Sequence, residues 1–268
     1  KVNLEEQFYC PGQFSLGEKI FHCWKPVGHG RITFLPALIH SCDVCFYQLG
    51  LRCGVDLLES YARKFGLEIP SQIDLPGENK GLIPGRVWKK RHTGESWYDG
   101  DTVNLAIGQG YMLVTPLAAA NLAATLANRG KLYQPHLVKK IVDEEESTVW
   151  EAQPHEILSV NLDSKTWQIL NEGLKEAVAQ GTGRAASLPG INIAGKTGTA
   201  QNPQGKDHAW FIGFAPVENP KIAYAIFVEH GGRGGVAAAP LARKVILTAL
   251  AIKEKEISVL NITDKESD

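Results

Sequence analysis

The segment from Ala194 to Gln201 carries the side chains best suited to chemistry in this chain. It reads A-G-K-T-G-T-A-Q, in which a lysine and two threonines alternate with small residues after an apolar run. This pattern predicts a half-buried β-strand. Gly195 and Gly198 leave its face bare, which indicates that another backbone or a ligand approaches closely. A lysine and two hydroxyl groups at such a strand could bind a carboxylate or a peptide. The pattern also fits a strand that simply ends in a polar turn.

A second polar pair stands immediately before an apolar, helix-forming stretch. Ser41 and Asp43 are two positions apart, and Val44 opens the apolar run. The pair could cap a helix, since serine and aspartate accept hydrogen bonds from the first backbone N–H groups. It could also place a hydroxyl and a carboxylate at a helix N-terminus that faces a cleft. Taken alone, the pattern favours the cap.

The five cysteines all lie in the first fifth of the chain, and Cys42 and Cys45 have the C-x-x-C spacing of redox and zinc sites. Zinc needs further ligands, and no second C-x-x-C or H-x-x-x-H pair is present. We therefore expect no metal and no cofactor, with Cys42, Cys45 and Cys53 buried as small apolar side chains on a helix. Cys10 and Cys23 bracket a short loop and could form a disulfide in an oxidising compartment.

The composition excludes several classes of protein. With 28 basic and 29 acidic residues, the chain has no bulk field to attract nucleic acid or anionic lipid. No run of roughly 18 apolar residues predicts a membrane span. Gly108-Gln109-Gly110 is too sparse for a dinucleotide-binding fingerprint. A length of 268 residues supports a sizeable core, in one large domain or two smaller lobes.

The elements that must position these residues are helical in the first half and mixed in the second. One helix is expected to begin near Thr33. Further helices are expected to cover 55–65, 116–129, 164–179 and 240–252. Strands are expected around 8–9, 20–24, 191–201, 209–217 and 221–229, with an exposed hairpin within 131–160. Residues 67–101 are expected to form a long loop near a cleft. The polar tail 253–268 is expected to be loosely held.

Five motifs in a fixed order resemble those of one enzyme family. They are Gly28-His29-Gly30, Ser41-Cys42-Asp43 with Phe46-Tyr47-Gln48, Ile107-Gly108-Gln109-Gly110-Tyr111, Thr115-Pro116-Leu117, and Lys196-Thr197-Gly198-Thr199-Ala200-Gln201. Together they resemble the penicillin-binding transpeptidases and their serine β-lactamase relatives, and among them the class B, elongation-type penicillin-binding protein 2 family. The resemblance covers about residues 5–250.

The resemblance implies an α+β fold, with an antiparallel sheet flanked by helices and an all-helical lobe. Residues 1–252 are then expected to be a partial transpeptidase domain. Its helical lobe would span roughly 31–130 and its sheet lobe roughly 131–252.

The implied activity is acyl transfer that cross-links peptidoglycan during cell-wall elongation. In this family a serine attacks the bond between the two terminal D-alanines of a stem peptide, and an amine of a second strand resolves the acyl-enzyme. β-Lactams trap that intermediate. The implied partners are stem peptides, β-lactams and a membrane glycosyltransferase of the elongation complex, with no nucleic acid. The implied location is the periplasmic face of the bacterial inner membrane, with an anchoring N-terminal segment outside this chain.

The resemblance also assigns roles to residues of this chain. Ser41 would relay a proton between the reacting nitrogen and the lysines of the site. Asp43 stands where many relatives have asparagine, although elongation-type members often carry aspartate. Lys196 would supply positive charge to the proton network and to the substrate carboxylate. The hydroxyls of Thr197 and Thr199 would hold that carboxylate, and the Thr199 N–H would form half of an oxyanion hole. The implied substrate-binding residues are Thr197, Gly198 and Thr199.

The family's nucleophile motif, S-x-x-K, is absent from this chain, because no serine here is followed by lysine three positions later. Ser15 precedes Lys19 by four positions and lies in a loop-like stretch. In the family this motif precedes the equivalent of Ser41 by several tens of residues. We therefore expect a C-terminal portion of a transpeptidase domain that lacks its nucleophile helix and its first strands, and that is inactive alone. A separate segment or a second copy is expected to cover the gap.

Two other classes of protein stay open. One is a catalytically dead scaffold or binding module of the cell wall, which would also lack S-x-x-K upstream. The other is a β-lactamase or β-lactam sensor on the same fold. The long 67–101 region and the stretch from Gly108 to Tyr111 favour the transpeptidase over this second class.

Overall fold

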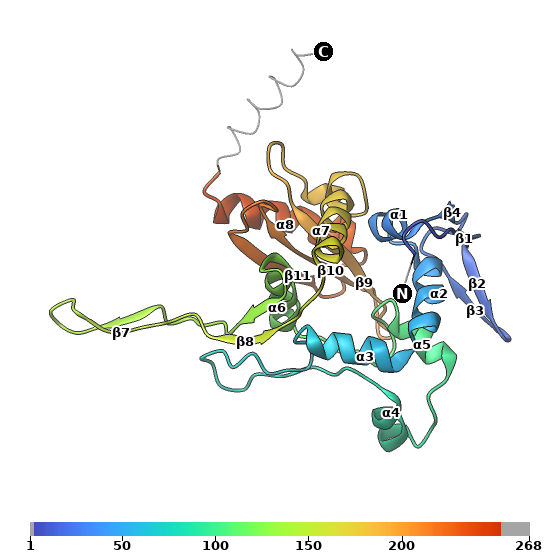
Figure 1. Cartoon of the computed structure of the whole chain (residues 1–268), viewed down its shortest axis with the longest axis horizontal. Helices are drawn as coiled ribbons and strands as arrows, with labels where there is room; N and C mark the ends of the chain where they lie inside the picture. Colours follow the sequence, from blue (N-terminus) through green and yellow to red (C-terminus); the bar gives the residue numbers. More distant parts are fainter. Residues whose placement is uncertain (1–2, 253–268) are drawn as a thin grey trace, which may run out of the picture.

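An antiparallel sheet in the order β11–β10–β9 places the lysine-containing strand at its edge in the computed structural model, which describes residues 3–252 (Figure 1). Its strands are β9 (Ala194–Ala200), β10 (His208–Ala215) and β11 (Ile222–Val228). The register pairs Thr197 with Phe211, and Phe211 with Ile226. The central strand β10 therefore supplies the apolar side chains around which the sheet packs, and β9 keeps one edge open.

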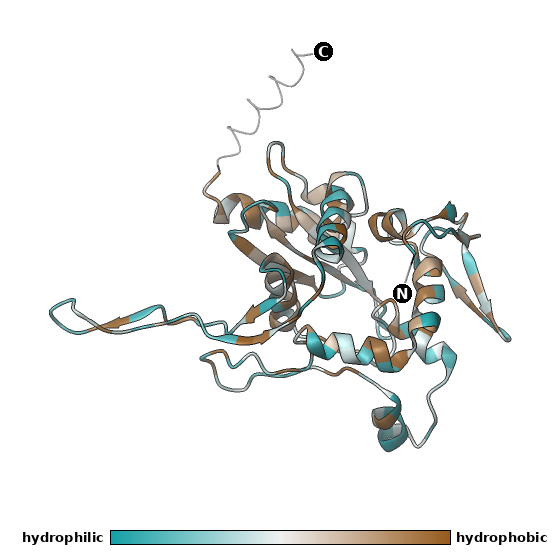
Figure 2. Cartoon of the chain, viewed as in Figure 1, coloured by the Kyte–Doolittle hydropathy of each residue, from teal (hydrophilic) through white to brown (hydrophobic). Residues whose placement is uncertain are grey.

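Three helices pack against this sheet. Helix α8 (Gly234–Ala249) lies on β10 and β11, α6 (Pro116–Ala127) lies on β11, and α7 (Ser164–Ala179) lies on β9. Figure 2 shows apolar residues along β10, β11 and α8. The buried cluster between sheet and helix includes Phe211, Tyr224 and Ile246. Burial of these side chains stabilises the sheet by the hydrophobic effect.

Phe211 is the side chain whose loss is expected to weaken this core most. It is fully buried, and its ring stacks on Tyr224 with a centroid distance of 6.0 Å. Phe211→Ala is expected to cost about 3–5 kcal/mol of unfolding free energy, because a cavity remains. Phe227→Ala on β11 is the matched control, since Phe227 is 38% exposed. Urea unfolding measures both, and equal midpoints for the two variants would contradict the prediction.

The first part of the chain forms small antiparallel strand pairs beside a set of short helices. The strands are β1 (Phe8–Cys10), β2 (Gln13–Leu16), β3 (Lys19–His22) and β4 (Gly30–Ile32), paired as β1–β4 and β2–β3. The helices are α1 (Phe34–Ile39), α2 (Asp43–Cys53), α3 (Val55–Lys64), α4 (Arg86–Thr93) and α5 (Asp99–Leu105). Helix α2 is largely buried, and Val44, Cys45 and Tyr47 join its core to the strand pairs.

A thin arm projects from the body between α6 and α7 (Figure 1). It consists of β5 (Lys131–Tyr133), β6 (Lys140–Val142), β7 (Thr148–Glu151) and β8 (Glu156–Ser159), paired as β5–β8 and β6–β7. The acidic stretch 144–146 lies at the exposed tip between β6 and β7. A 3-10 turn, η1 (Arg184–Ala186), follows α7 and packs against α8.

Most predicted elements are confirmed where local signals are strong. The Thr115 hydroxyl accepts a hydrogen bond from the Ala118 N–H and so caps α6, which lies within the predicted helix 116–129. The Asp163 carboxylate caps α7 by accepting from the Thr166 N–H. The exposed hairpin, the antiparallel strands β10 and β11 and the early strands near 8–9 and 20–24 are also confirmed, although their partners β4 and β2 were not predicted.

Two predictions of local structure are wrong. Residues 67–101 are not one long loop, because α4 and the start of α5 lie within them. Helix α8 begins at Gly234 and not at Pro240, which lies inside the helix. The reason is close packing, since a Cβ atom at Gly234 would lie 2.3 Å from the Gly198 carbonyl oxygen. Gly234 and Gly235 therefore start a helix that packs against the bare face of β9.

Within residues 3–252, no helix is both long enough and apolar enough to cross a membrane. The predicted tail 253–268 lies outside the described residues.

Candidate active site

Four polar side chains from distant parts of the chain meet in one hydrogen-bonded chain. Lys196 Nζ, on β9, donates to Ser41 Oγ. Ser41 Oγ shares a hydrogen bond of 3.1 Å with Thr182 Oγ1, which in turn shares one of 2.7 Å with Thr197 Oγ1. An ammonium group can only donate, whereas a hydroxyl both accepts and donates. Ser41 can therefore accept from Lys196 and pass its own proton on toward Thr182.

Ser41 lies in the short link between α1 and α2, and it does not cap α2. Its φ is +54°, in the left-handed region that costs energy for a residue with a side chain. The helix N-cap is Cys42, and no side chain caps it by a hydrogen bond. The cap interpretation is thus wrong, because Ser41 Oγ bonds to Lys196 and Thr182 and Asp43 Oδ2 accepts from the Trp24 N–H. The strained backbone directs the Ser41 hydroxyl toward Lys196.

Asp43 is held in place by the N-terminal part of the chain. Its Oδ2 accepts a hydrogen bond of 2.8 Å from the Trp24 N–H, and Trp24 Nε1 donates to the His40 carbonyl oxygen at 3.0 Å. Burial raises the pKa of the Asp43 carboxyl to about 6, although the Trp24 hydrogen bond opposes that rise. Trp24 therefore bonds to His40 and to Asp43, the residues on either side of the segment that carries Ser41.

Lys196 is the charged group of the cluster. Burial lowers the pKa of its ammonium group to about 8, and the negative charge of Asp43 opposes the fall. The group is thus mostly charged at neutral pH and close to its titration point. A lysine in this state can hold an anionic group or exchange a proton with Ser41.

The open edge of β9 continues the site beyond Lys196. Thr199 is exposed, and its Oγ1 accepts from the Gly234 N–H at 3.3 Å. The bare strand face predicted at Gly198 is confirmed, because Gly234 at the start of α8 approaches the Gly198 backbone. The Thr197 hydroxyl is engaged by Thr182. The residues predicted as site residues thus lie on one strand edge and one interhelical link that face each other.

Two residues that join this cluster were missed from the sequence. In the sequence, Thr182 stands between two glycines just after the predicted helix 164–179, and Trp24 ends the predicted strand 20–24. Neither belongs to a motif, and each reaches its partner across the fold, Thr182 to Ser41 over 141 positions. The positive φ of Ser41 cannot be read from its residue type either. No local sequence signal identifies these contacts.

A thiol cluster adjoins Ser41 and Asp43, because one of its members, Cys42, lies between them in the chain. The side-chain ligand atoms of Cys10, Cys23, His29 and Cys42 all lie within 4.8 Å of one another. The three cysteines are buried free thiols, so Cys10 and Cys23 form no disulfide here. Hydrogen bonding from Cys42 lowers the pKa of the Cys23 thiol well below its ordinary value. Cys45, the second cysteine of the C-x-x-C pair, lies outside the cluster, and Cys53 is half-buried.

This cluster has the donor chemistry and the spacing of a zinc site. Three cysteines and a histidine are one of the ligand sets of structural zinc, with bonds of about 2.3 Å to sulfur and 2.0 Å to nitrogen. Tetrahedral geometry then separates a sulfur from a nitrogen by about 3.5 Å. His29 Nδ1 lies 3.6 Å from Cys10 Sγ and 3.5 Å from Cys23 Sγ. These four side chains come from separate segments of the chain, so the paired spacings that indicate zinc sites in a sequence do not mark them.

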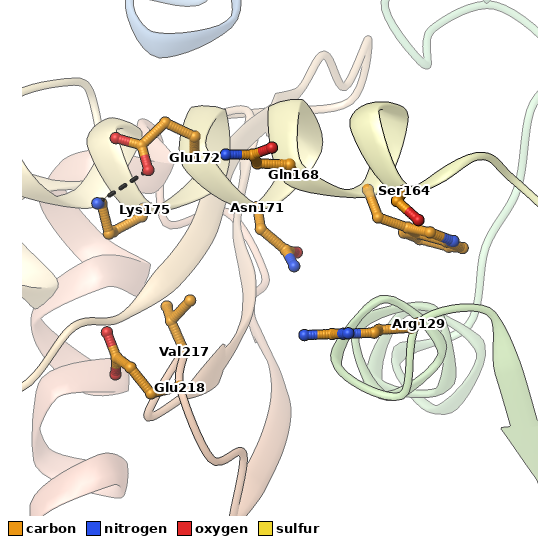
Figure 3. Close-up of a pocket in the computed structure, with 9 residues that line it drawn as sticks. Arg129, Ser164, Gln168, Asn171, Glu172, Lys175, Val217 and Glu218 are labelled. Atoms are coloured by element: carbon orange, nitrogen blue, oxygen red, sulfur yellow. Dashed lines mark ion pairs between the residues drawn. The ribbon is translucent and has the colours of Figure 1, made fainter.

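A polar cavity of about 510 Å³ lies elsewhere, between α7, Arg129 and the turn from β10 to β11 (Figure 3). An ion pair of 2.9 Å joins Glu172 and Lys175 at its rim. Asn171 points into it, and its Oδ1 is buried without a hydrogen-bond partner. None of the lining residues belongs to the Ser41–Lys196 cluster. The cavity is thus separate from the candidate active site.

Comparison with protein families shows the family of this chain. Residues 1–247 match the penicillin binding protein transpeptidase domain. The chain belongs to this transpeptidase-domain family. The family and the elongation-type resemblance predicted from the five motifs are confirmed. Peptidoglycan D,D-transpeptidase MrdA of Haemophilus influenzae is 36% identical over 259 residues, a match that covers 88% of this chain and 39% of that protein.

Solved structures of penicillin-binding proteins confirm the predicted α+β transpeptidase fold. PBP2 of Pseudomonas aeruginosa in complex with WCK 5153 has a TM-score of 0.81 and 36% identity, covering 95% of this chain and 55% of that one. PBP2 of Helicobacter pylori in complex with MreC has a TM-score of 0.79 and 30% identity, covering 94% and 47%. The chain thus spans about half of these structures or less, and less than half of its curated relatives.

Proposed function

We propose that this chain is the part of a penicillin-binding transpeptidase that completes the active site around a serine nucleophile supplied by another segment of the protein. The reaction is peptidoglycan D,D-transpeptidation, in which a stem peptide acylates that serine and an amine of a second strand releases it. The single observation that supports this most is the hydrogen-bonded chain from Lys196 through Ser41 and Thr182 to Thr197. In it Lys196 and Ser41 supply proton transfer, beside an open strand edge that can bind a peptide.

The residue roles belong to the same proposal. Lys196 and Ser41 face the reacting nitrogen, and Asp43 tunes the charge of Lys196. Thr197, Gly198 and Thr199 hold the substrate carboxylate and carbonyl oxygen along the edge of β9. The division into a helical lobe at roughly 31–130 and a sheet lobe at roughly 131–252 is proposed with it.

Intact-mass spectrometry with penicillin tests the function. The full-length protein is expected to gain one adduct per molecule on a serine outside this chain, and this chain alone none. An unmodified full-length protein would indicate the dead scaffold instead. An adduct that is lost within seconds would indicate a β-lactamase. An adduct on Ser41 would contradict the assignment of that residue to proton relay.

A pH dependence follows from Lys196. Its ammonium group, with a pKa of about 8, is charged below that pH and loses its charge above it. Capture of the penicillin carboxylate by the full-length protein is therefore expected to weaken as the pH rises from 7 to 10. Lys196→Arg keeps a charge over that range and is expected to abolish the alkaline fall, although at a lower rate. A stopped-flow series over pH tests both, and an identical alkaline fall in the two proteins would refute the assignment.

The proposed partners are peptidoglycan stem peptides, β-lactams and a membrane glycosyltransferase of an elongation complex. The similarity to a chain from a peptidoglycan synthase complex that coordinates polymerization and crosslinking supports a partner of this kind. The proposed location is the periplasmic face of the inner membrane, where such substrates lie.

A second function is favoured by the thiol cluster: Cys10, Cys23, His29 and Cys42 bind one zinc ion. The ion would tie β1, the β3–β4 link and the start of α2 together behind Ser41. It would act structurally, because all four coordination positions are taken by protein ligands.

Elemental analysis of the purified full-length protein tests the zinc site. About one zinc per chain is expected for the wild type, as for a structural site. Cys23→Ser is expected to lose most of it. Cys53→Ser is the matched control, because Cys53 lies outside the cluster. Wild-type protein without zinc, or equal zinc in the Cys23→Ser variant, would refute the site.

A further inference from the structure

Gln109 joins the loop after α5 to the open edge of β9. Its side-chain Nε2 donates to the Thr199 carbonyl oxygen at 3.0 Å, and its Oε1 accepts from the Gln201 N–H at 3.3 Å. These partners lie 90 and 92 positions further along the chain. A single side-chain amide thus uses both its donor and its acceptor on the backbone of one strand, in the place where a neighbouring strand would otherwise pair.

The loop that presents Gln109 has the backbone this contact needs. Gly108 and Gly110 have φ values of +75° and +79°, which glycine adopts without steric cost. The Gln109 N–H donates to the Asn104 carbonyl oxygen at 2.9 Å, near the end of α5. A turn between two left-handed glycines, anchored on a helix end, therefore directs the side chain at β9.

These bonds set the direction of the Thr199 backbone. In an antiparallel pair, the N–H and the C=O of one residue point to the same edge of the strand. The Thr199 carbonyl points to Gln109, so its N–H lies on the open edge as well, and Thr199 with its partner Ala209 forms a non-hydrogen-bonded pair. The Thr199 N–H is therefore available to a ligand that approaches this edge.

We propose that Gln109 is a positioning residue for acylation. Its amide holds the backbone at Thr199 and Gln201, so that the Thr199 N–H stays aimed at the substrate carbonyl oxygen as negative charge develops there. This inference rests on the proposed transpeptidase function. Within residues 3–252, the Gln109 side chain bonds only to the backbone of β9 and of Gln201 beside it, and it acts through that strand. Donors to a developing oxyanion are effective only when their geometry is already fixed, so a looser strand edge slows the chemical step.

The test is the acylation of the full-length protein by a fluorescent penicillin, with the chemical rate constant and the dissociation constant measured separately. Gln109→Ala is expected to lower the chemical rate constant by about 10- to 100-fold and to leave the dissociation constant within about twofold. Gln109→Glu keeps the acceptor for the Gln201 N–H but places a carboxylate against the Thr199 carbonyl, so it is expected to be at least as slow.

Gln134→Ala is the matched control. The Gln134 amide also donates to a distant backbone carbonyl, that of Gln72 at 2.6 Å, but Gln134 directly follows β5 on the arm and lies outside the site. Its rate constant is expected to equal that of the wild type.

The outcomes separate this inference from the proposed function. Wild-type protein that is never acylated would mean that the function is wrong. Normal acylation of the wild type with an unchanged rate constant in Gln109→Ala would overturn the positioning role alone. Faster acylation of that variant would overturn it too, because Gln109 would then obstruct the edge. A change in the dissociation constant or in thermal stability alone, without a change in the chemical rate, would also count against it.

Discussion

Replacing Lys196 by alanine is expected to lower the rate of penicillin acylation of the full-length protein by about 10²- to 10⁴-fold, the range found for positioned proton-transfer groups. Lys196 Nζ is the donor to Ser41 Oγ, and no other lysine or arginine in residues 3–252 has a hydrogen bond to that oxygen. Without it, Ser41 loses its charged partner, and the buried Asp43 loses the nearby positive charge that favours its ionised form.

The matched control for this variant is Lys175→Ala. Lys175 forms an ion pair with Glu172 on α7 and lies outside the candidate active site. The control is expected to be acylated at the wild-type rate, since an exposed ion pair contributes about 0–1 kcal/mol to stability. Thermal unfolding of both variants shows whether either is misfolded. A Lys196→Ala protein that folds normally and is acylated within threefold of the wild-type rate would contradict the role assigned to Lys196.

Removal of zinc from the full-length protein is expected to lower its melting temperature by about 10 °C. Zinc binding contributes several kcal/mol to folding. Each kcal/mol shifts the melting temperature of a domain of this size by about 2–4 °C. The ion would hold Cys42, which lies between Ser41 and Asp43, and Cys23, which precedes Trp24. Loss of the ion is therefore expected to slow acylation as well as to destabilise the fold.

This prediction is checked by treatment with a strong chelator, followed by thermal unfolding and by re-addition of zinc. Stability and acylation rate are expected to fall together and to recover together. The Cys23→Ser variant is expected to behave like chelated wild type and to gain nothing from added zinc. The Cys53→Ser variant is expected to respond as the wild type does. A chelator-treated wild type with unchanged melting temperature would show that the cluster does not depend on a metal.

The sequence by itself determined the elements whose signals are local. The Thr115-Pro116 start of α6 and the Asp163 cap of α7 depend only on which side chain can satisfy the first free N–H groups of a helix. The alternation of apolar residues in β10 determines which side of the sheet is buried. The motif at Lys196 and the pair Ser41 and Asp43 also identified the family, which the comparisons confirm.

The tertiary structure decided every contact between segments that are distant in the chain. Thr182 meets Ser41 because the end of α7 returns beside α1, where the Thr182 N–H donates to the Ile39 carbonyl oxygen at 3.4 Å. Gln109 reaches β9 because two left-handed glycines turn its loop toward the strand. Neither arrangement has a spacing that can be recognised, since the residues involved form no local repeat.

The proposed zinc ligands and the start of α8 also depend on contacts between distant segments. Cys10, Cys23, His29 and Cys42 come from four segments that only folding brings together, so no paired spacing in the sequence marks them. The helix start at Gly234 was predicted too late because glycine disfavours helices in isolation. Its packing against Gly198 at short range outweighs that preference. Local propensity thus predicted the elements, and close packing decided how they form a site.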